Sequence, residues 1–169
     1  MDNYNKNLKL LTENHIYSKD MEHDACGVGV IVSTEGKKSR KIVEYGIEAL
    51  KAVWHRGAVD ADGKTGDGAG IHVEIPKDFF IEKIEVTGHD YDNSEICVGM
   101  IFLPRNDYSS QESCKTIVES ELTKNDFSIY GWRQVPVNPK VLGEKAFQTM
   151  PEIIQVLFKS YNPELTNKD

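Results

Sequence analysis

Residues 22–32, EHDACGVGVIV, place a cysteine directly before two closely spaced glycines and an apolar run. Such a run, rich in β-branched residues, is typical of a buried strand, and we predict one over residues 27–34. A structural cysteine is expected inside a strand, whereas Cys26 precedes it, and Gly27 and Gly29 allow close approach to the backbone. Cys26 is therefore a candidate nucleophile, with a small buried side chain as the ordinary alternative.

The residues before Cys26 are polar and rich in Asn, Lys and Asp. We predict that residues 1–25 form a flexible leader. They lack the apolar core of a signal peptide, and no stretch approaches the roughly 18 apolar residues of a membrane span. The expected compartment is the cytoplasm.

Composition favours one globular domain. The 169 residues are 39% hydrophobic and 28% charged, with a net charge of −7. This charge argues against nucleic acid or an anionic membrane as a partner. The three cysteines show no zinc-like spacing, and their odd number argues against a disulfide framework. We expect Cys97 and Cys114 to pack in a core as small hydrophobic side chains.

Downstream, helical and strand-like segments alternate unevenly. Ser39 is a candidate N-cap for a helix over residues 40–54. Further strands are predicted at 71–75, 95–104 and 127–137. Helices are predicted at 77–84 and, beginning from a Ser cap, at 109–125. An exposed helix or turn is predicted at 139–148, and the segment 152–160 fits either a strand or a helix. The helices are too few for regular βαβ units, so the pattern favours an α+β layered fold.

Residues 55–70, HRGAVDADGKTGDGAG, contain five glycines and must be irregular. GDGAGI fits neither a phosphate loop nor a dinucleotide fingerprint. The segment also lacks the ligand positions of a calcium-binding EF-hand loop. Asp60, Asp62 and Asp67 are expected to hold a tight turn, with contact to a substrate ammonium group as the alternative.

His55 and Arg56 stand at the end of the predicted helix. A cation there interacts favourably with the helix dipole, which is a purely structural role. Alternatively, the planar guanidinium of Arg56 binds a carboxylate. The spacing alone leaves both interpretations open.

Five segments together resemble the glutamine amidotransferase domain of glutamate synthase, a class II amidotransferase. They are HDACGVGVIV, HRGAVDADGKTGDGAGIHVEIPKDFF, CVGMIFLP, YGWRQVPVNPKVLG and MPEIIQVLF. The resemblance runs from about Glu22 to Phe158. It implies an N-terminal nucleophile hydrolase fold, an αββα sandwich of which this chain would be the N-terminal part over residues 26–169, preceded by the leader-like residues 1–25.

The resemblance also implies a mechanism. Family members remove a short leader to expose the cysteine as the first residue, so the cut would fall between Ala25 and Cys26. The freed α-amine would then act as base for the Cys26 thiol, which attacks the carboxamide of glutamine. Arg56 and Gly57 are the implied substrate-binding residues, with Arg56 on the glutamine α-carboxylate and the loop from Gly57 to Gly70 shaping the pocket.

The family's Asn-Gly segment, which supplies the oxyanion hole, has no counterpart before Asp169. Loss of one oxyanion donor costs about 100-fold to 1000-fold, so we expect the 169-residue chain to be inactive alone. The FMN and iron–sulfur cluster of the full-length family would lie in the synthase region, and this chain is expected to bind no cofactor. The implied partners are glutamine and the remaining glutamate synthase domains or a small subunit. The alternatives are a non-catalytic module that binds glutamine or a partner, and an amidase for another amide.

Overall fold

A computed structural model describes residues 6, 9–10, 12–13, 27–54, 57–66 and 68–161. The chain divides into two compact units, Met1–Gly57 and Ala58–Asp169. Most of the predicted leader lies outside the described residues, as do Cys26 and Arg56.

In the first unit, helix α2 spans Arg40–Ala52. The Ser39 side chain accepts a hydrogen bond from the Lys41 backbone N–H at 3.2 Å and so caps the helix. Its apolar residues recur at helical spacing, and those at 42, 43, 47 and 50 are half-buried, whereas their polar neighbours are exposed. The prediction of this helix from its cap and its periodicity is confirmed.

Two predicted strands are absent from the described residues. Residues 27–33 have no strand pairing, and Val28 and Val30 remain 87% and 83% exposed. Residues 71–75, in the second unit, are irregular too, with Val73 42% exposed. A strand needs a neighbouring segment to accept and donate its backbone hydrogen bonds. Within the described part of the chain neither segment is paired in a sheet, so β-branched composition alone gave the wrong prediction.

The second unit contains a three-stranded antiparallel sheet in the order β1-β3-β2. Its strands are β1 (Cys97–Leu103), β2 (Phe127–Gln134) and β3 (Glu152–Ser160). The two strands predicted at 95–104 and 127–137 are confirmed, and the ambiguous segment 152–160 is a strand. Residues 154–157 of β3 are all buried because this central strand is covered on both faces. A mostly apolar run, interrupted here only by the buried Gln155, is therefore compatible with a central strand.

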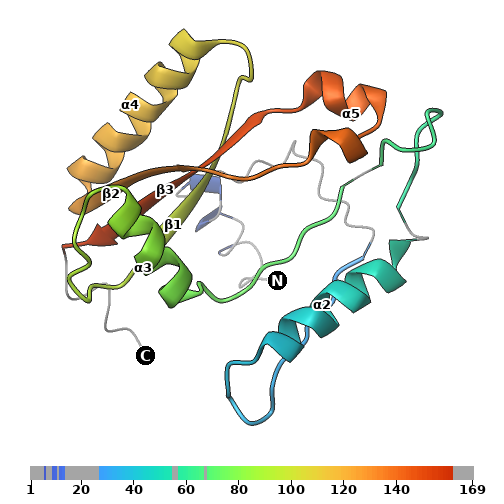
Figure 1. The fold of residues 1–169 in the computed structure, drawn as a ribbon, viewed down its shortest axis with the longest axis horizontal. Coiled ribbons are helices and arrows are strands. Elements are labelled where there is room, and N and C mark those ends of the chain that lie inside the picture. Colours follow the sequence, from blue (N-terminus) through green and yellow to red (C-terminus); the bar gives the residue numbers. More distant parts are fainter. Residues whose placement is uncertain are drawn as a thin grey trace. The chain divides into compact units, whose positions relative to one another are not determined.

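One helix covers each face of the sheet. Helix α3 is Lys77–Val86 and α4 is Tyr108–Lys124. Leu157 packs with Phe80 and Ile84 of α3 in a core cluster completed by Ile96 and Tyr130. Successive strand residues point to opposite faces, so the neighbouring Val156 faces α4. Figure 1 shows the strands crossing between these two helices.

The cap of α4 differs from the prediction. Asp107, and not a serine, is the N-cap, and its carboxylate accepts hydrogen bonds from the backbone N–H and the hydroxyl of Ser110 at 3.0 and 2.6 Å. Asp and Ser are comparable caps, and the start of the helix is set by which of them faces the free N–H groups. The helix itself is confirmed.

Gly131 of β2 has a structural role in the YGWR motif. The register of β2 shifts between Ile129 and Gly131, and Gly131 has φ 151°. A Cβ atom on Gly131 would lie 2.9 Å from the Thr87 methyl carbon, while the Thr87 hydroxyl donates to the Tyr130 carbonyl at 2.9 Å. The bulge thus seats the end of α3 against the sheet.

Two short elements lie between β2 and β3. They are the 3₁₀ turn η2 (Pro139–Val141) and helix α5 (Glu144–Thr149), in agreement with the predicted exposed helix or turn. Cys97 and Cys114 are only half-buried and lie outside the core cluster, contrary to expectation. Among the described helices, none combines the length and hydropathy needed to cross a membrane. The α+β class is confirmed at the level of one small antiparallel sheet with helices.

Candidate functional site

Cys26 and Arg56 lie outside the described residues, as do their preceding neighbours Ala25 and His55, and the description resumes at Gly27 and at Gly57. Gly57 is exposed, and its N–H donates to the Trp54 carbonyl at 3.1 Å. Gly27 and Gly29 are exposed, with no other described atom within 4 Å of the place where a Cβ would stand. Among the described residues, nothing contacts the positions where Cβ atoms of Gly27 and Gly29 would stand.

We use the name glycine loop for residues 57–70. Its described residues are irregular apart from one isolated bridge between Val59 and Gly66, as predicted. Beyond this bridge the chain turns tightly, because the Asp60 N–H donates to the Thr65 carbonyl at 2.7 Å and the Gly63 N–H donates to the Asp60 carbonyl at 2.9 Å. The loop is thus a folded turn with its own hydrogen bonds.

The carboxylate of Asp62 organises the tip of the turn. One oxygen, Oδ1, accepts from the backbone N–H groups of Lys64 and Thr65 at 2.9 and 2.7 Å. The other, Oδ2, accepts from the Thr65 hydroxyl at 2.6 Å. The Thr65 hydroxyl first, and then these backbone donors, hold the pKa of Asp62 well below its usual range. Asp62 is therefore an anion whose lone pairs serve the turn.

Asp60 has a similar structural role. Its Oδ1 accepts from the Ala61 N–H at 2.6 Å, and its Oδ2 forms an ion pair with Lys145 at 2.6 Å. The prediction that aspartates hold the turn is confirmed for Asp60 and Asp62, while Asp67 lies outside the described residues.

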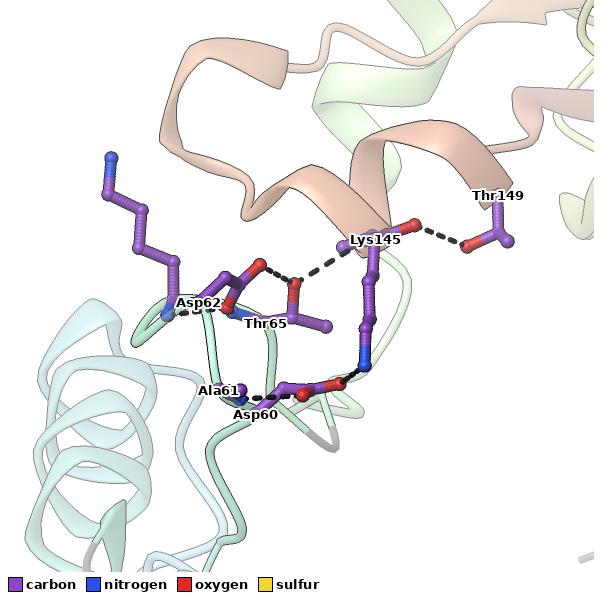
Figure 2. Close-up of polar contacts among 8 residues, drawn as sticks. Asp60, Ala61, Asp62, Thr65, Lys145 and Thr149 are labelled. Carbon is purple, nitrogen blue, oxygen red and sulfur yellow. Dashed lines mark hydrogen bonds and ion pairs between the residues drawn. The ribbon is translucent and has the colours of Figure 1, made fainter.

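The glycine loop rests on the beginning of helix α5 (Figure 2). Lys145 reaches Asp60, and the Thr65 hydroxyl oxygen accepts from the Ala146 N–H at 3.5 Å. This contact could not be predicted from the sequence, because Asp60 and Lys145 are 85 positions apart. The one feature of the sequence that pointed to this region was the motif YGWRQVPVNPKVLG, which ends at Gly143.

The second unit contains a cavity against the glycine loop and another beside α4. The first, of about 240 Å³, is lined by Ala58, Val59, Asp60, Thr65 and Gly66. The other, of about 360 Å³, lies between α4 and strands β2 and β3, with Arg105, Gln111, Trp132 and Glu152 among its lining residues. The larger cavity contains none of the residues predicted to bind glutamine.

Within the described residues, no three His, Cys, Asp or Glu side chains gather closely enough to hold a metal ion. Cys97 on β1 is not activated, because burial, and to a smaller extent the charge of Glu95, raises the pKa of its thiol. The described residues thus do not fit an iron–sulfur cluster, and we derive no step through one.

Comparison with known proteins identifies the family. The profile of the class II glutamine amidotransferases matches residues 26–169. The chain is 54% identical over 154 residues to the glutamate synthase [NADPH] large chain of Azospirillum brasilense, covering 91% of this chain and 10% of that protein. It is 39% identical over 155 residues to the ferredoxin-dependent glutamate synthase of Pyropia yezoensis, and the matched region again covers 91% of this chain and 10% of that protein.

The glutamate synthase [NADH] of Saccharomyces cerevisiae is 38% identical over 148 residues, which cover 84% of this chain and 7% of that protein. The chain thus spans about a tenth of the length of these curated relatives. The profile match includes the glycine loop, the YGWR motif and β3. The chain belongs to the class II glutamine amidotransferases, in a form that matches the large chains of glutamate synthases.

Proposed function

We propose that this chain supplies the glutaminase chemistry of a glutamate synthase, hydrolysing glutamine to glutamate and ammonia with Cys26 as an N-terminal nucleophile. The observation that carries the proposal is the family match, which begins at Cys26 and runs to residue 169. The identity to glutamate synthases of Azospirillum, Pyropia and Saccharomyces supports the same assignment. The finer fold, an N-terminal nucleophile hydrolase sandwich with a second sheet, belongs to this proposal.

In the proposed reaction, residues 1–25 are removed and the α-amine of Cys26 becomes free. This amine, with an ordinary pKa of about 7.7–8, takes the thiol proton at neutral pH. The sulfur adds to the carboxamide carbon of glutamine, the C–N bond breaks, and the nitrogen leaves as ammonia with the transferred proton. Water then hydrolyses the thioester to glutamate and restores the thiol. With Ala25 still attached, the nitrogen is an amide and cannot act as base.

Substrate orientation is assigned to Arg56 and Gly57. The guanidinium of Arg56 offers a planar pair of donors that matches the α-carboxylate of glutamine. The small residues Gly27 and Gly29, which follow Cys26 directly, would leave room for a substrate at the backbone next to the nucleophile. The ammonia would pass to 2-oxoglutarate in the remaining domains of the enzyme, which are the proposed partners of this chain together with a small subunit.

The test is the intact mass and N-terminal sequence of the protein isolated from the cells that make it, with a glutaminase assay on the same sample. We expect a chain that begins at Cys26 and releases ammonia and glutamate in equal amounts. Cys26→Ala should abolish ammonia release, whereas Cys114→Ala, which removes a half-buried thiol elsewhere, should retain it. Activity that survives in Cys26→Ala, or in a chain that still carries Ala25, would refute the mechanism. Glutamine binding without ammonia release would indicate a binding module instead.

A further inference from the structure

Gly143 closes the YGWRQVPVNPKVLG motif and is buried directly against the glycine loop. A Cβ atom on Gly143 would lie within 2.5 Å of the Thr65 hydroxyl oxygen, of Asp62 Oδ2 and of the Thr65 backbone nitrogen. Its φ of −71° and ψ of 165° are open to any residue. Glycine is thus needed at position 143 for space and not for backbone conformation.

The space is filled by a turn that bonds to the first residues of α5. The Asp62 carboxylate, which the tip of the turn already uses, also lies close enough to the Glu144 backbone N–H for this group to lower the pKa of Asp62, as the smallest of its causes. The Thr65 hydroxyl oxygen accepts from the Ala146 N–H. These backbone donors are the N–H groups that a helix leaves free in its first turn. The loop therefore caps α5, and α5 in return fixes the loop.

The third link is weaker. The ion pair between Asp60 and Lys145 is short, at 2.6 Å, but the Lys145 side chain is 65% exposed. Exposed ion pairs contribute little because water screens them. The ion pair therefore adds little to the close fit of Asp62 and Thr65 over Gly143.

We propose that Gly143 is a positioning residue for the glutamine pocket: its missing side chain seats the glycine loop on α5 and so fixes the shape in which the loop meets the substrate. The inference rests on the proposed function, in which this loop helps to form the pocket. The loop begins at Gly57, directly after the proposed carboxylate-binding residue, and Ala58 to Gly66 are held by the contacts described above. A loop fixed before binding costs the substrate less ordering free energy than a loose one.

The experiment compares Gly143→Ala with Val141→Ala in the full-length protein that begins at Cys26. Val141 is 68% exposed and two positions upstream, so its truncation is the matched control. The alanine methyl at position 143 displaces Asp62 and Thr65, and we expect KM for glutamine to rise at least about tenfold, on the scale of one lost charge-assisted hydrogen bond. We expect kcat to stay within about threefold, because Cys26 and its amine are untouched. Val141→Ala should change neither.

A substitution at Thr65 gives an independent test. Thr65→Val removes the hydroxyl that bonds both Asp62 and α5 and should raise KM, whereas Thr65→Ser keeps the hydroxyl and should restore it. Hydrogen exchange of residues 58–66, measured without glutamine, should be faster in Gly143→Ala and unchanged in β3. A merely structural role would lower kcat through loss of folded protein and leave KM unchanged.

The outcomes separate the two claims. Wild-type hydrolysis combined with an unchanged KM in Gly143→Ala overturns the positioning role and leaves the proposed function standing. A wild-type protein that neither binds nor hydrolyses glutamine refutes the proposed function, and the positioning role with it. Loop exchange that is equally fast in wild type and Gly143→Ala shows that α5 does not hold the loop, whatever the activity.

Discussion

Gly99, in edge strand β1, is paired directly with Val156 in the central strand β3. A Cβ atom at position 99 would lie 2.7 Å from the Val156 Cγ1 atom and 3.7 Å from Phe158 Cε1. Val156 is 1% exposed and is enclosed between the sheet and α4, so it has little room to move. Gly99→Ala should therefore overpack this face and destabilise the protein by about 1–3 kcal/mol, despite the better strand propensity of alanine.

The companion substitution supplies the missing space. Val156→Ala alone removes two buried methyl groups and leaves a small cavity, at a cost of about 2–3 kcal/mol. If the two effects were independent, the double variant would lose about 3–6 kcal/mol. We expect a loss of only about 1–2 kcal/mol, because the methyl group introduced at position 99 occupies part of the space that Val156 vacates.

Urea unfolding followed by circular dichroism measures these free energies. The m-value should stay constant across the set, since the folded and unfolded surfaces hardly change. Gly70→Ala is the control, as a Cβ there meets nothing within 4 Å, and it should shift stability by less than about 0.5 kcal/mol. Strict additivity in the double variant, or a Gly99→Ala protein as stable as wild type, would show that the pairing is looser than described.

Three further predictions concern the capping and polar contacts. Tyr130→Phe removes the hydroxyl that donates to Asp92 Oδ1 at 2.9 Å and should lower the free energy of unfolding by about 1 kcal/mol. This loss should appear as faster hydrogen exchange in residues 87–94, and unchanged exchange there would contradict the prediction. The pKa of Asp92 is held well below its usual range by Lys159 first, and then by Ser94 and Tyr130. Its contribution to folding stability is therefore present above an unfolded pKa of about 4 and is lost as the pH falls further. Acid unfolding of Asp92→Asn should depend less steeply on pH than that of wild type, and an identical slope would refute this. Ser39→Ala removes the cap of α2 and should cost about 1 kcal/mol, seen as lower helicity by circular dichroism, whereas Ser39→Asp should retain it.

The elements that were predicted correctly depend on local signals. Helix α2 carries both a side-chain cap and helical spacing of its apolar residues. The segments of β1 and β2 are rich in β-branched and aromatic residues, and both are paired with β3. The segments 27–34 and 71–75 have the same strand-like composition but are not paired with a strand among the described residues. Whether such a run becomes a strand is decided by a segment elsewhere in the chain, and composition does not contain that information.

In the candidate site, too, features set by neighbouring residues were predicted and those set by distant residues were not. The acidic turn of the glycine loop was predicted because Asp and Gly determine turns locally. Its attachment to α5 was not, because Gly143 has an ordinary backbone conformation and Asp60 and Lys145 are far apart in the sequence. Cys26 and Arg56 remain predictions, since both lie outside the described residues.

The strand order β1-β3-β2 has a consequence for synthesis of the protein. The strand at the centre of the sheet is the last of the three to leave the ribosome, and the partner strand of β1 and β2 is complete only when residue 160 has emerged. At about 5–20 residues per second, roughly 3–11 s separate the completion of β1 from that of β3. During this interval α3, β1 and α4 carry apolar faces that β3 does not yet cover, and the nascent chain is then most exposed to aggregation and to chaperones.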